Sequence, residues 1–176
     1  ERSASGPRAR NVILFVGDGM GIPTITAARI RAGQLAGGSG EEYALSLDRF
    51  PFTAFSKTYT VDHQVPDSAG TMTAMVTGVK TRSGVIAVNE NVAIGEFTAV
   101  ARNSLASILD IAEARGMATG LVTTTRVTHG TPASLYAKSP DRQWEDDADM
   151  AVNSQAARDA GFPDIARQLV EYSIGD

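Results

Sequence analysis

Cysteine is absent from the 176 residues of the chain, which excludes disulfide bridges, thiolate zinc sites and cysteine nucleophiles. Only two histidines occur, His63 and His129, so a zinc site built from this chain alone would depend on carboxylates, which is an unusual ligand set. No apolar run approaches the ~18 residues that span a bilayer. Basic residues are fewer than acidic ones and the net charge is −4, which argues against nucleic-acid binding.

The remaining composition, 43% hydrophobic and 20% charged, is typical of a globular domain with one core. Residues 1–10 are polar and small and lack the apolar middle of a signal peptide, so we expect a flexible N-terminal extension. Residues 11–176 are predicted to belong to one domain. A helical pattern near the end leads into 173–176 as if toward another strand, so we expect the chain to stop within that domain. The alternative is a complete small domain with a frayed tail.

Hydrophobic patterns and turn signals alternate along the chain in the manner of an α/β protein. Strands are predicted at 11–16, 52–61 and 117–124, and helices at 23–35, at 68–76 with Gly78 as the stop, and between Ser104 as N-cap and Gly116. This order predicts a layered αβα sandwich around a largely parallel sheet. Ligands of such sheets bind at the carboxyl ends of the strands, which is where three candidate loops fall.

The first candidate loop carries Asp18, which follows a predicted buried strand and is flanked by Gly17 and Gly19. Small neighbours let a metal or phosphate approach the backbone, and a buried acid needs a cation. A turn aspartate bonded to nearby amides is the alternative. A dinucleotide-binding loop is disfavoured, because the glycine spacing differs from Gly-x-Gly-x-x-Gly and an acid there would repel a pyrophosphate.

The second candidate is Ser68, at the first turn of a predicted helix. Backbone N–H groups without helical partners and the positive end of the helix dipole would stabilise an alkoxide and a bound phosphoryl group there. The alternative is an ordinary serine N-cap, a part that Asp67 can play equally well. A triad hydrolase is disfavoured, since the Gly-x-Ser-x-Gly elbow is absent and no histidine-plus-acid set is evident nearby.

The third candidate loop contains His129 and Thr131, followed by Pro132 as the expected first residue of a short helix that Thr131 caps. A threonine hydroxyl suits an oxygen-rich magnesium site. His129 has three interpretations: a zinc ligand, a partner of metal-bound water, or a structural histidine, which is favoured when the residue is considered alone. Further along, the planar fork of Arg142 suits phosphate oxygens, although an isolated arginine carries almost no signal.

Taken together, these segments resemble the alkaline phosphatase family from about Asn11 to Glu171. Four motifs occur in the family's order: Asn-Val-Ile-Leu-Phe-Val-Gly-Asp-Gly-Met-Gly at 11–21, Pro-Asp-Ser-Ala-Gly-Thr at 66–71, Thr-His-Gly-Thr-Pro at 128–132, and Asp141-Arg142. The resemblance implies an alkaline-phosphatase-like fold and a hydrolase that cleaves phosphate monoesters through a phosphoserine intermediate.

The resemblance also implies a metal centre with two zinc ions and one magnesium ion. Asp18 matches the aspartate that bridges the magnesium and the second zinc, Ser68 the nucleophile coordinated by that zinc, and Thr131 a magnesium ligand. His129 falls where members carry aspartate or histidine, and imidazole suits zinc better than magnesium. The other ligands of the family lie beyond residue 176, and no histidine follows His129, so this chain alone is expected to be an incomplete and inactive catalyst.

For the phosphate itself, Arg142 matches the clamping arginine of the family and Asp67 the acid that orients it. The implied partners are a phosphate monoester, inorganic phosphate, the remainder of the catalytic domain and a second copy in a homodimer, and the implied location is periplasmic or extracellular. The alternatives are a phosphodiesterase or sulfatase of the same superfamily, or a non-catalytic fragment that binds phosphate or metal.

Overall fold

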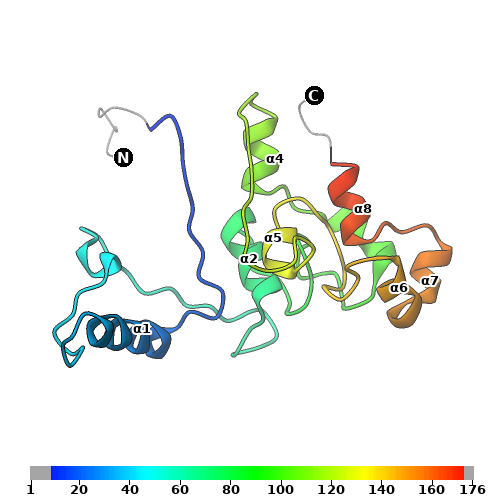
Figure 1. Cartoon of the computed structure of the whole chain (residues 1–176). Coiled ribbons are helices and arrows are strands. Elements are labelled where there is room, and N and C mark those ends of the chain that lie inside the picture. Colours follow the sequence, from blue (N-terminus) through cyan, green and yellow to red (C-terminus); the bar gives the residue numbers. More distant parts are fainter. Residues whose placement is uncertain (1–8, 173–176) are drawn as a thin grey trace. The chain divides into compact units, whose positions relative to one another are not determined.

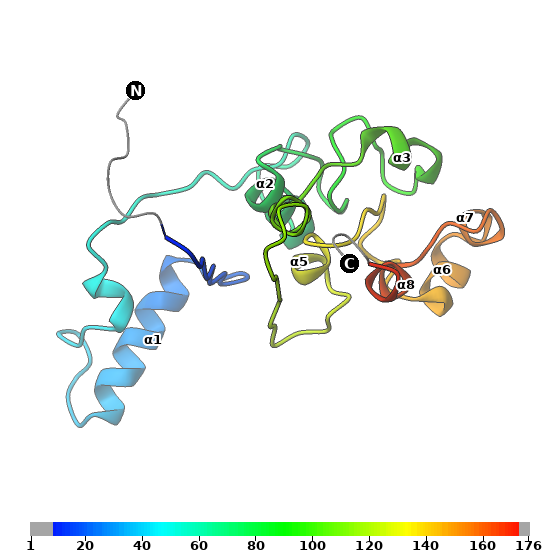
Figure 2. The same ribbon diagram turned by 90° about the horizontal axis from the view of Figure 1, so that it is seen from above.

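The computed structural model describes residues 9–172 of the chain, which divides into two units, Glu1–Thr53 and Ala54–Asp176 (Figures 1 and 2). Most of the predicted N-terminal extension, residues 1–8, and the predicted approach to a further strand at 173–176 lie outside the described residues. Within residues 9–172, no helix is both long and apolar enough to cross a membrane.

The first unit is built on helix α1 (Ile22–Leu35), which confirms the predicted helix there, and a short 3₁₀ helix, η1 (Ser46–Arg49). The loop after α1 turns back along the helix, because Gly33 carries no side chain on the face where it packs. A Cβ atom at Gly33 would lie 2.6 Å from the Cα atom of Gly40. Arg29 of α1 donates from Nη1 to the carbonyl oxygen of Gly40 at 3.3 Å, which ties the loop to the helix.

The second unit contains short helices joined by long loops, as Figure 1 shows. They are α2 (Ser68–Thr77), η2 (Phe97–Ala99), α3 (Val100–Asn103), α4 (Ile108–Glu113), α5 (Gly130–Ala133), α6 (Asp147–Asn153), α7 (Gln155–Asp159) and α8 (Ile165–Val170). Helix α2 agrees with the predicted helix at 68–76 and ends where it was expected to, because Gly78 adopts the left-handed conformation at φ 74°.

The predicted parallel sheet is not formed by residues 9–172. Pairing between extended segments there is limited to two antiparallel bridges, Ile86 with Ser139 and Val88 with Ser104. The segments predicted as strands expose large apolar side chains: Phe15 is 89% exposed, Phe55 94% and Val122 102%. A strand needs a neighbour for its backbone groups and its apolar face, so the sheet stays a prediction.

The core of the second unit consists of three apolar clusters. The first contains Ala69, Ile86, Ala87, Ala133, Tyr136, Ala137 and Ile165 and therefore joins α2, α5 and α8. The second contains Val85, Val88, Val92, Ala99 and Val100, and the third contains Trp144, Met150 and Ala157. Phe162 packs against both the second and the third, with its ring edge-on to Trp144 at 5.6 Å between centroids. The first cluster lies next to the predicted site, because Ala69 directly follows Ser68.

The N-cap predicted at Ser104 for the helix carrying Ile108 is wrong. Helix α4 is capped by Ser107, whose hydroxyl accepts from the N–H of Asp110 at 3.1 Å, while the Asp110 carboxylate accepts from the N–H of Ser107 at 2.8 Å. Ser104 is held instead by its bridge to Val88, and its hydroxyl donates to the carbonyl oxygen of Val100 at 2.9 Å. Two hydroxyl residues three positions apart both suit a cap, and tertiary pairing decides between them.

Candidate active site

The candidate site is centred on the first turn of α2. Asp67 is the N-cap of this helix, and its Oδ1 accepts from the N–H of Gly70 at 3.0 Å. Ser68 is the first helical residue, so the capping role falls to the aspartate and not to the serine. The half-buried Ser68 hydroxyl accepts a hydrogen bond from Nη1 of Arg142 at 3.0 Å. The serine therefore lies at the helix tip with its oxygen directed at a cation.

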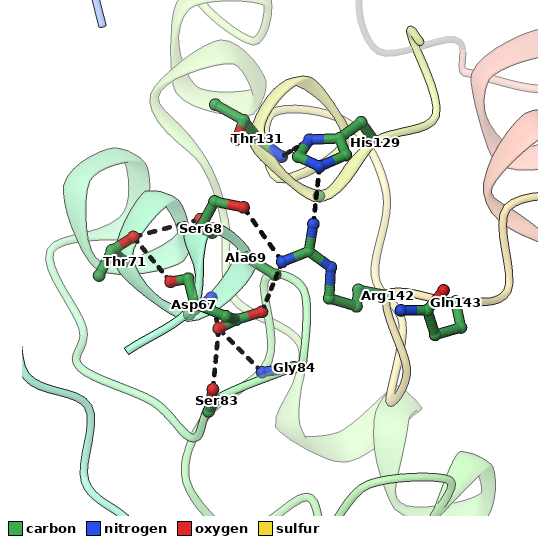
Figure 3. A network of polar contacts seen from close by, with 12 residues as sticks. Asp67, Ser68, Ala69, Thr71, Ser83, Gly84, His129, Thr131, Arg142 and Gln143 are labelled. Carbon is green, nitrogen blue, oxygen red and sulfur yellow. Dashed lines mark hydrogen bonds and ion pairs between the residues drawn. The ribbon is translucent and has the colours of Figure 1, made fainter. Parts of the chain in front are cut away.

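Arg142 connects the start of α2 to the start of α5 (Figure 3). Its Nη1 donates to Oδ2 of Asp67 at 2.8 Å as well as to Ser68, and its Nη2 lies 2.8 Å from Nε2 of His129. The side chain is 19% exposed, and the backbone N–H of Arg142 donates to the carbonyl oxygen of Gly84 at 2.8 Å. The guanidinium is thus fixed at both ends and partly shielded from water.

The Asp67 carboxylate uses its two oxygens for different purposes. Oδ2 binds Arg142, and Oδ1 accepts from the N–H groups of Gly70 and Gly84, both at 3.0 Å, and from the hydroxyl of Ser83 at 3.1 Å. Burial alone would raise the pKa of Asp67, but the N–H groups of Gly84 and Gly70 and the Arg142 guanidinium outweigh it and hold the pKa below its ordinary value. The carboxylate is therefore ionised at neutral pH and can anchor the arginine.

His129, and not Thr131, is the N-cap of α5, so the predicted threonine cap is wrong. The helix begins at Gly130, two residues before Pro132, and the carbonyl oxygen of His129 accepts from the N–H of Ala133 at 3.0 Å. Nδ1 of His129 lies 3.5 Å from the Thr131 N–H, at the outer limit of a hydrogen bond. The shorter contact, at 2.8 Å, joins Nε2 to Nη2 of Arg142, and because a guanidinium can only donate, Nε2 is directed at an N–H group of the arginine.

Small residues allow the starts of α2 and α5 to meet, and both ribbon views show these helices side by side. A Cβ atom at Gly130 would lie 2.9 Å from the Cβ atom of the fully buried Ala69 and 3.4 Å from Cζ of Arg142. Ser134 then donates to the carbonyl oxygen of Gly130 at 2.7 Å. The close approach places the His129 ring and the Ser68 hydroxyl on the same guanidinium.

Of the six site residues predicted from the sequence, five gather in the second unit: Asp67, Ser68, His129, Thr131 and Arg142 (Figure 3). Asp18 lies in the first unit, exposed in a turn before α1, and its approach to Ser68 stays a prediction. Ser83 and Gly84 also belong to the site but are not among the predicted residues. Their single sequence signal is a Ser-Gly turn pair, and Gly84 indeed has φ 82°.

Several of the residues predicted to bind metal carry side chains of suitable chemistry. The hydroxyls of Ser68 and Thr131 and the carboxylate of Asp18 are hard oxygen donors that suit magnesium, and the imidazole of His129 suits zinc. Residues 9–172 contain no group of three or more histidine, cysteine, aspartate and glutamate side chains placed to hold a metal ion. The donor chemistry therefore fits these metals, while a complete set of ligands is not assembled in the described part of the chain.

The sequence model of the family described as "Alkaline phosphatase" matches residues 9–175. The chain is 49% identical over 164 residues to an alkaline phosphatase of Gadus morhua, covering 93% of this chain and 34% of that protein. It is 48% identical over 168 residues to the human tissue-nonspecific isozyme, covering 96% of this chain and 31% of the isozyme. The chain thus spans about a third of the length of these relatives.

A solved structure supports the same relationship. The crystal structure of a cold-active alkaline phosphatase from a psychrophilic Shewanella species matches with a TM-score of 0.58 at 34% identity, covering 73% of this chain and 29% of that one. The match supports an alkaline-phosphatase-like fold, as the sequence motifs predict. Because the family's sequence model covers nearly every residue, the conclusion is direct: the chain belongs to the alkaline phosphatase family.

Proposed function

We propose that the protein hydrolyses phosphate monoesters and that Ser68 is the nucleophile that carries the phosphoryl group. The observation that carries the proposal is the 3.0 Å contact between Nη1 of Arg142 and Oγ of Ser68. A guanidinium is a planar, bidentate ligand for phosphate oxygens. An ester bound by Arg142 therefore has its phosphorus within reach of the serine oxygen.

The residues of this chain divide the chemistry among them. Ser68 loses its hydroxyl proton to solvent as Oγ attacks phosphorus in line with the ester oxygen. The bond from phosphorus to that oxygen breaks, and the leaving alkoxide takes a proton from solvent. Water then attacks the phosphoserine and gives a proton to solvent, the bond from phosphorus to Oγ breaks, and Oγ takes up a proton, which releases inorganic phosphate and restores the hydroxyl. Arg142 offsets negative charge on the equatorial oxygens throughout, and Asp67 keeps it in place. The positive end of the α2 dipole favours both the alkoxide and the bound phosphoryl group.

We further propose that the complete centre holds two zinc ions and one magnesium ion. Asp18, Ser68 and Thr131 would supply oxygen ligands, and His129 would act in or beside the magnesium shell. When bound, such ions lower the pKa of a coordinated hydroxyl and neutralise charge on phosphate oxygens. The remaining ligands would come from residues outside this chain, which supplies the nucleophile and the arginine clamp and is inactive by itself.

The same proposal accounts for the exposed apolar segments. Residues 11–16, 52–61 and 117–124 have the composition of strands, and most of their large apolar side chains lack cover in the described chain. We propose that they join a largely parallel sheet with the remainder of a single catalytic domain, of which residues 11–176 are the N-terminal part. Assembly as a homodimer and a periplasmic or extracellular location are part of the proposal and rest on the family alone.

Substitution of the nucleophile in the full-length protein tests the assignment. Ser68→Ala is expected to lower kcat/KM for a phosphate monoester by at least about 10³-fold, because the covalent route is removed. It should also abolish the labelled phosphoserine that wild type forms after acid quenching with radioactive phosphate. Ser39→Ala is the matched control, since Ser39 is exposed in the loop after α1 and outside both the site and the predicted strands. Full turnover by the alanine variant, or a preference of the wild type for diesters or sulfate esters, would contradict the proposal.

A further inference from the structure

A layer of contacts behind Asp67 has no part in the proposed chemistry. The Ser83 hydroxyl donates to Oδ1 of Asp67 at 3.1 Å, on the oxygen that also caps α2 (Figure 3). The next residue, Gly84, donates its N–H to the same oxygen at 3.0 Å and accepts from the N–H of Arg142 at 2.8 Å. The turn at 83–84 therefore contacts both Asp67 and Arg142, which together form the phosphate clamp. It donates hydrogen bonds to the Asp67 carboxylate, and its backbone carbonyl accepts one from the backbone N–H of Arg142.

This turn is itself anchored by a second carboxylate. Oδ1 of Asp62 accepts from the N–H of Ser83 at 2.9 Å and from the hydroxyl of Thr60 at 2.9 Å, and it lies 3.1 Å from Nδ1 of His63. Burial alone would raise the pKa of Asp62, but the Ser83 N–H, His63 and Thr60 lower it to about 2. A second bond joins the 60–63 loop to the segment just before this turn: the N–H of Val61 donates to the carbonyl oxygen of Thr81 at 3.0 Å.

We propose that Ser83 and Asp62 are positioning residues: Asp62 holds the turn, and Ser83 sets the rotation of the Asp67 carboxylate and thereby the placement of the Arg142 guanidinium against Ser68. This inference rests on the proposed function and deepens it. Ser83 and Asp62 would then control how tightly the site binds phosphate, although neither residue contacts the phosphate.

The physical reason lies in the geometry of a carboxylate that is bound on both sides. The N–H of Gly70 fixes only one point of the group, so the plane of the carboxylate can still turn about that contact. Donors from 83–84 approach from a second segment of the chain and remove this freedom. Because an ionised carboxylate only accepts, the Ser83 hydroxyl must donate to it. Misplacement of a clamping group by about 1 Å can cost up to about 10²-fold in rate, so small rotations here have measurable effects.

The test measures inhibition by inorganic phosphate in the full-length, metal-loaded protein. Ser83→Ala is expected to raise the inhibition constant Ki for phosphate by about 3- to 10-fold, the value of one typical intramolecular hydrogen bond. Ser83→Thr keeps the hydroxyl and should stay within about twofold of wild type. Ser104→Ala is the matched control, because it also removes a serine hydrogen bond, to the Val100 carbonyl, but lies outside the site.

A double-substitution cycle separates positioning from general loosening of the fold. If Ser83 acts through the arginine, Ser83→Ala should change Ki by less than about twofold when it is added to Arg142→Ala. An unchanged Ki in Ser83→Ala, or an undiminished further change in the Arg142→Ala background, would overturn the inference. If Ser83→Ala fails to fold, Asp62→Asn provides a second variant, because asparagine has the same shape as aspartate but lacks its charge. Asp62→Asn is also expected to raise Ki for phosphate. Failure of the proposed function is distinguishable, because it would appear as full turnover by Ser68→Ala.

Discussion

Replacing Asp110 by alanine removes a carboxylate that joins three parts of the second unit. Its Oδ2 accepts from Nζ of Lys138 and from the N–H of Ser107, both at 2.8 Å, and its Oδ1 accepts from the Tyr172 hydroxyl at 2.9 Å. The residue is 9% exposed, so water replaces few of these contacts. The substitution therefore breaks the capping box of α4 and the attachment of the segment after α8 in one step.

The size of the effect follows from these contacts. The Ser107 hydroxyl still caps α4, but loss of the bond from the Ser107 N–H to the Asp110 carboxylate costs about 1 kcal/mol. Breaking a buried ion pair costs about 3–5 kcal/mol because the remaining charge has no partner, but the Lys138 side chain is 23% exposed, which reduces that part. We expect Asp110→Ala to lower the free energy of unfolding by about 3 kcal/mol. Adding Lys138→Met to Asp110→Ala should recover part of the loss, since the uncompensated ammonium is then gone.

Urea unfolding at pH 7 and at lower pH measures this prediction. Burial would raise the pKa of Asp110, but Lys138, the Ser107 N–H and Tyr172 lower it below its ordinary value. A carboxyl whose pKa is lower in the folded state stabilises the fold above its unfolded pKa of about 3.9, and this contribution is lost as the pH falls through the folded value. The difference in the free energy of unfolding between wild type and Asp110→Ala should therefore have its full value at pH 7 and become smaller below about pH 4. A difference that is the same at pH 3 and pH 7, or a double variant less stable than Asp110→Ala alone, would refute the reasoning.

Two further predictions concern stability. Gly78→Ala should lower the free energy of unfolding by about 1 kcal/mol, because Gly78 ends α2 with a left-handed backbone at φ 74°. Gly120→Ala is the control: this position is open and has no positive φ, so the free energy of unfolding should change by less than about 0.5 kcal/mol in the same urea titration. Phe162→Ala should cost about 2–4 kcal/mol, since this half-buried ring packs edge-on against Trp144 and links two apolar clusters; a thermal midpoint unchanged in calorimetry would contradict that role.

The helices were predictable where local chemistry decides their ends. Gly78 stops α2 because the position requires a left-handed backbone, and glycine adopts it at no steric cost. Caps were less predictable, because more than one polar side chain near the starts of α4 and α5 could accept from a backbone N–H group. Ser107 caps α4, whereas Ser104 pairs with Val88, and such pairing between separate segments leaves no mark in a local sequence pattern.

The site shows the same division between local and distant information. Ser68 at a helix tip has a local rationale, but Arg142 lies 74 residues away and, as a single arginine, was predictable only through the family resemblance. Ser83 and Gly84 escaped prediction because part of what they offer is backbone N–H groups, which every residue type except proline supplies. The strands fall between these cases: their composition is local, but a ladder forms only with a partner, and residues 9–172 do not provide one.

The two oxygens of Asp67 link the stability of α2 to the geometry of the clamp. Oδ1 satisfies a backbone donor of the helix that carries the nucleophile, and Oδ2 holds the arginine that contacts the same nucleophile. A rotation of this one carboxylate would therefore move the helix cap and the guanidinium together, so Ser68 and Arg142 keep their separation only while Oδ1 is held. The donors from Ser83 and Gly84 supply that restraint from outside the helix, which explains why the turn at 83–84 is bonded to both partners of the clamp.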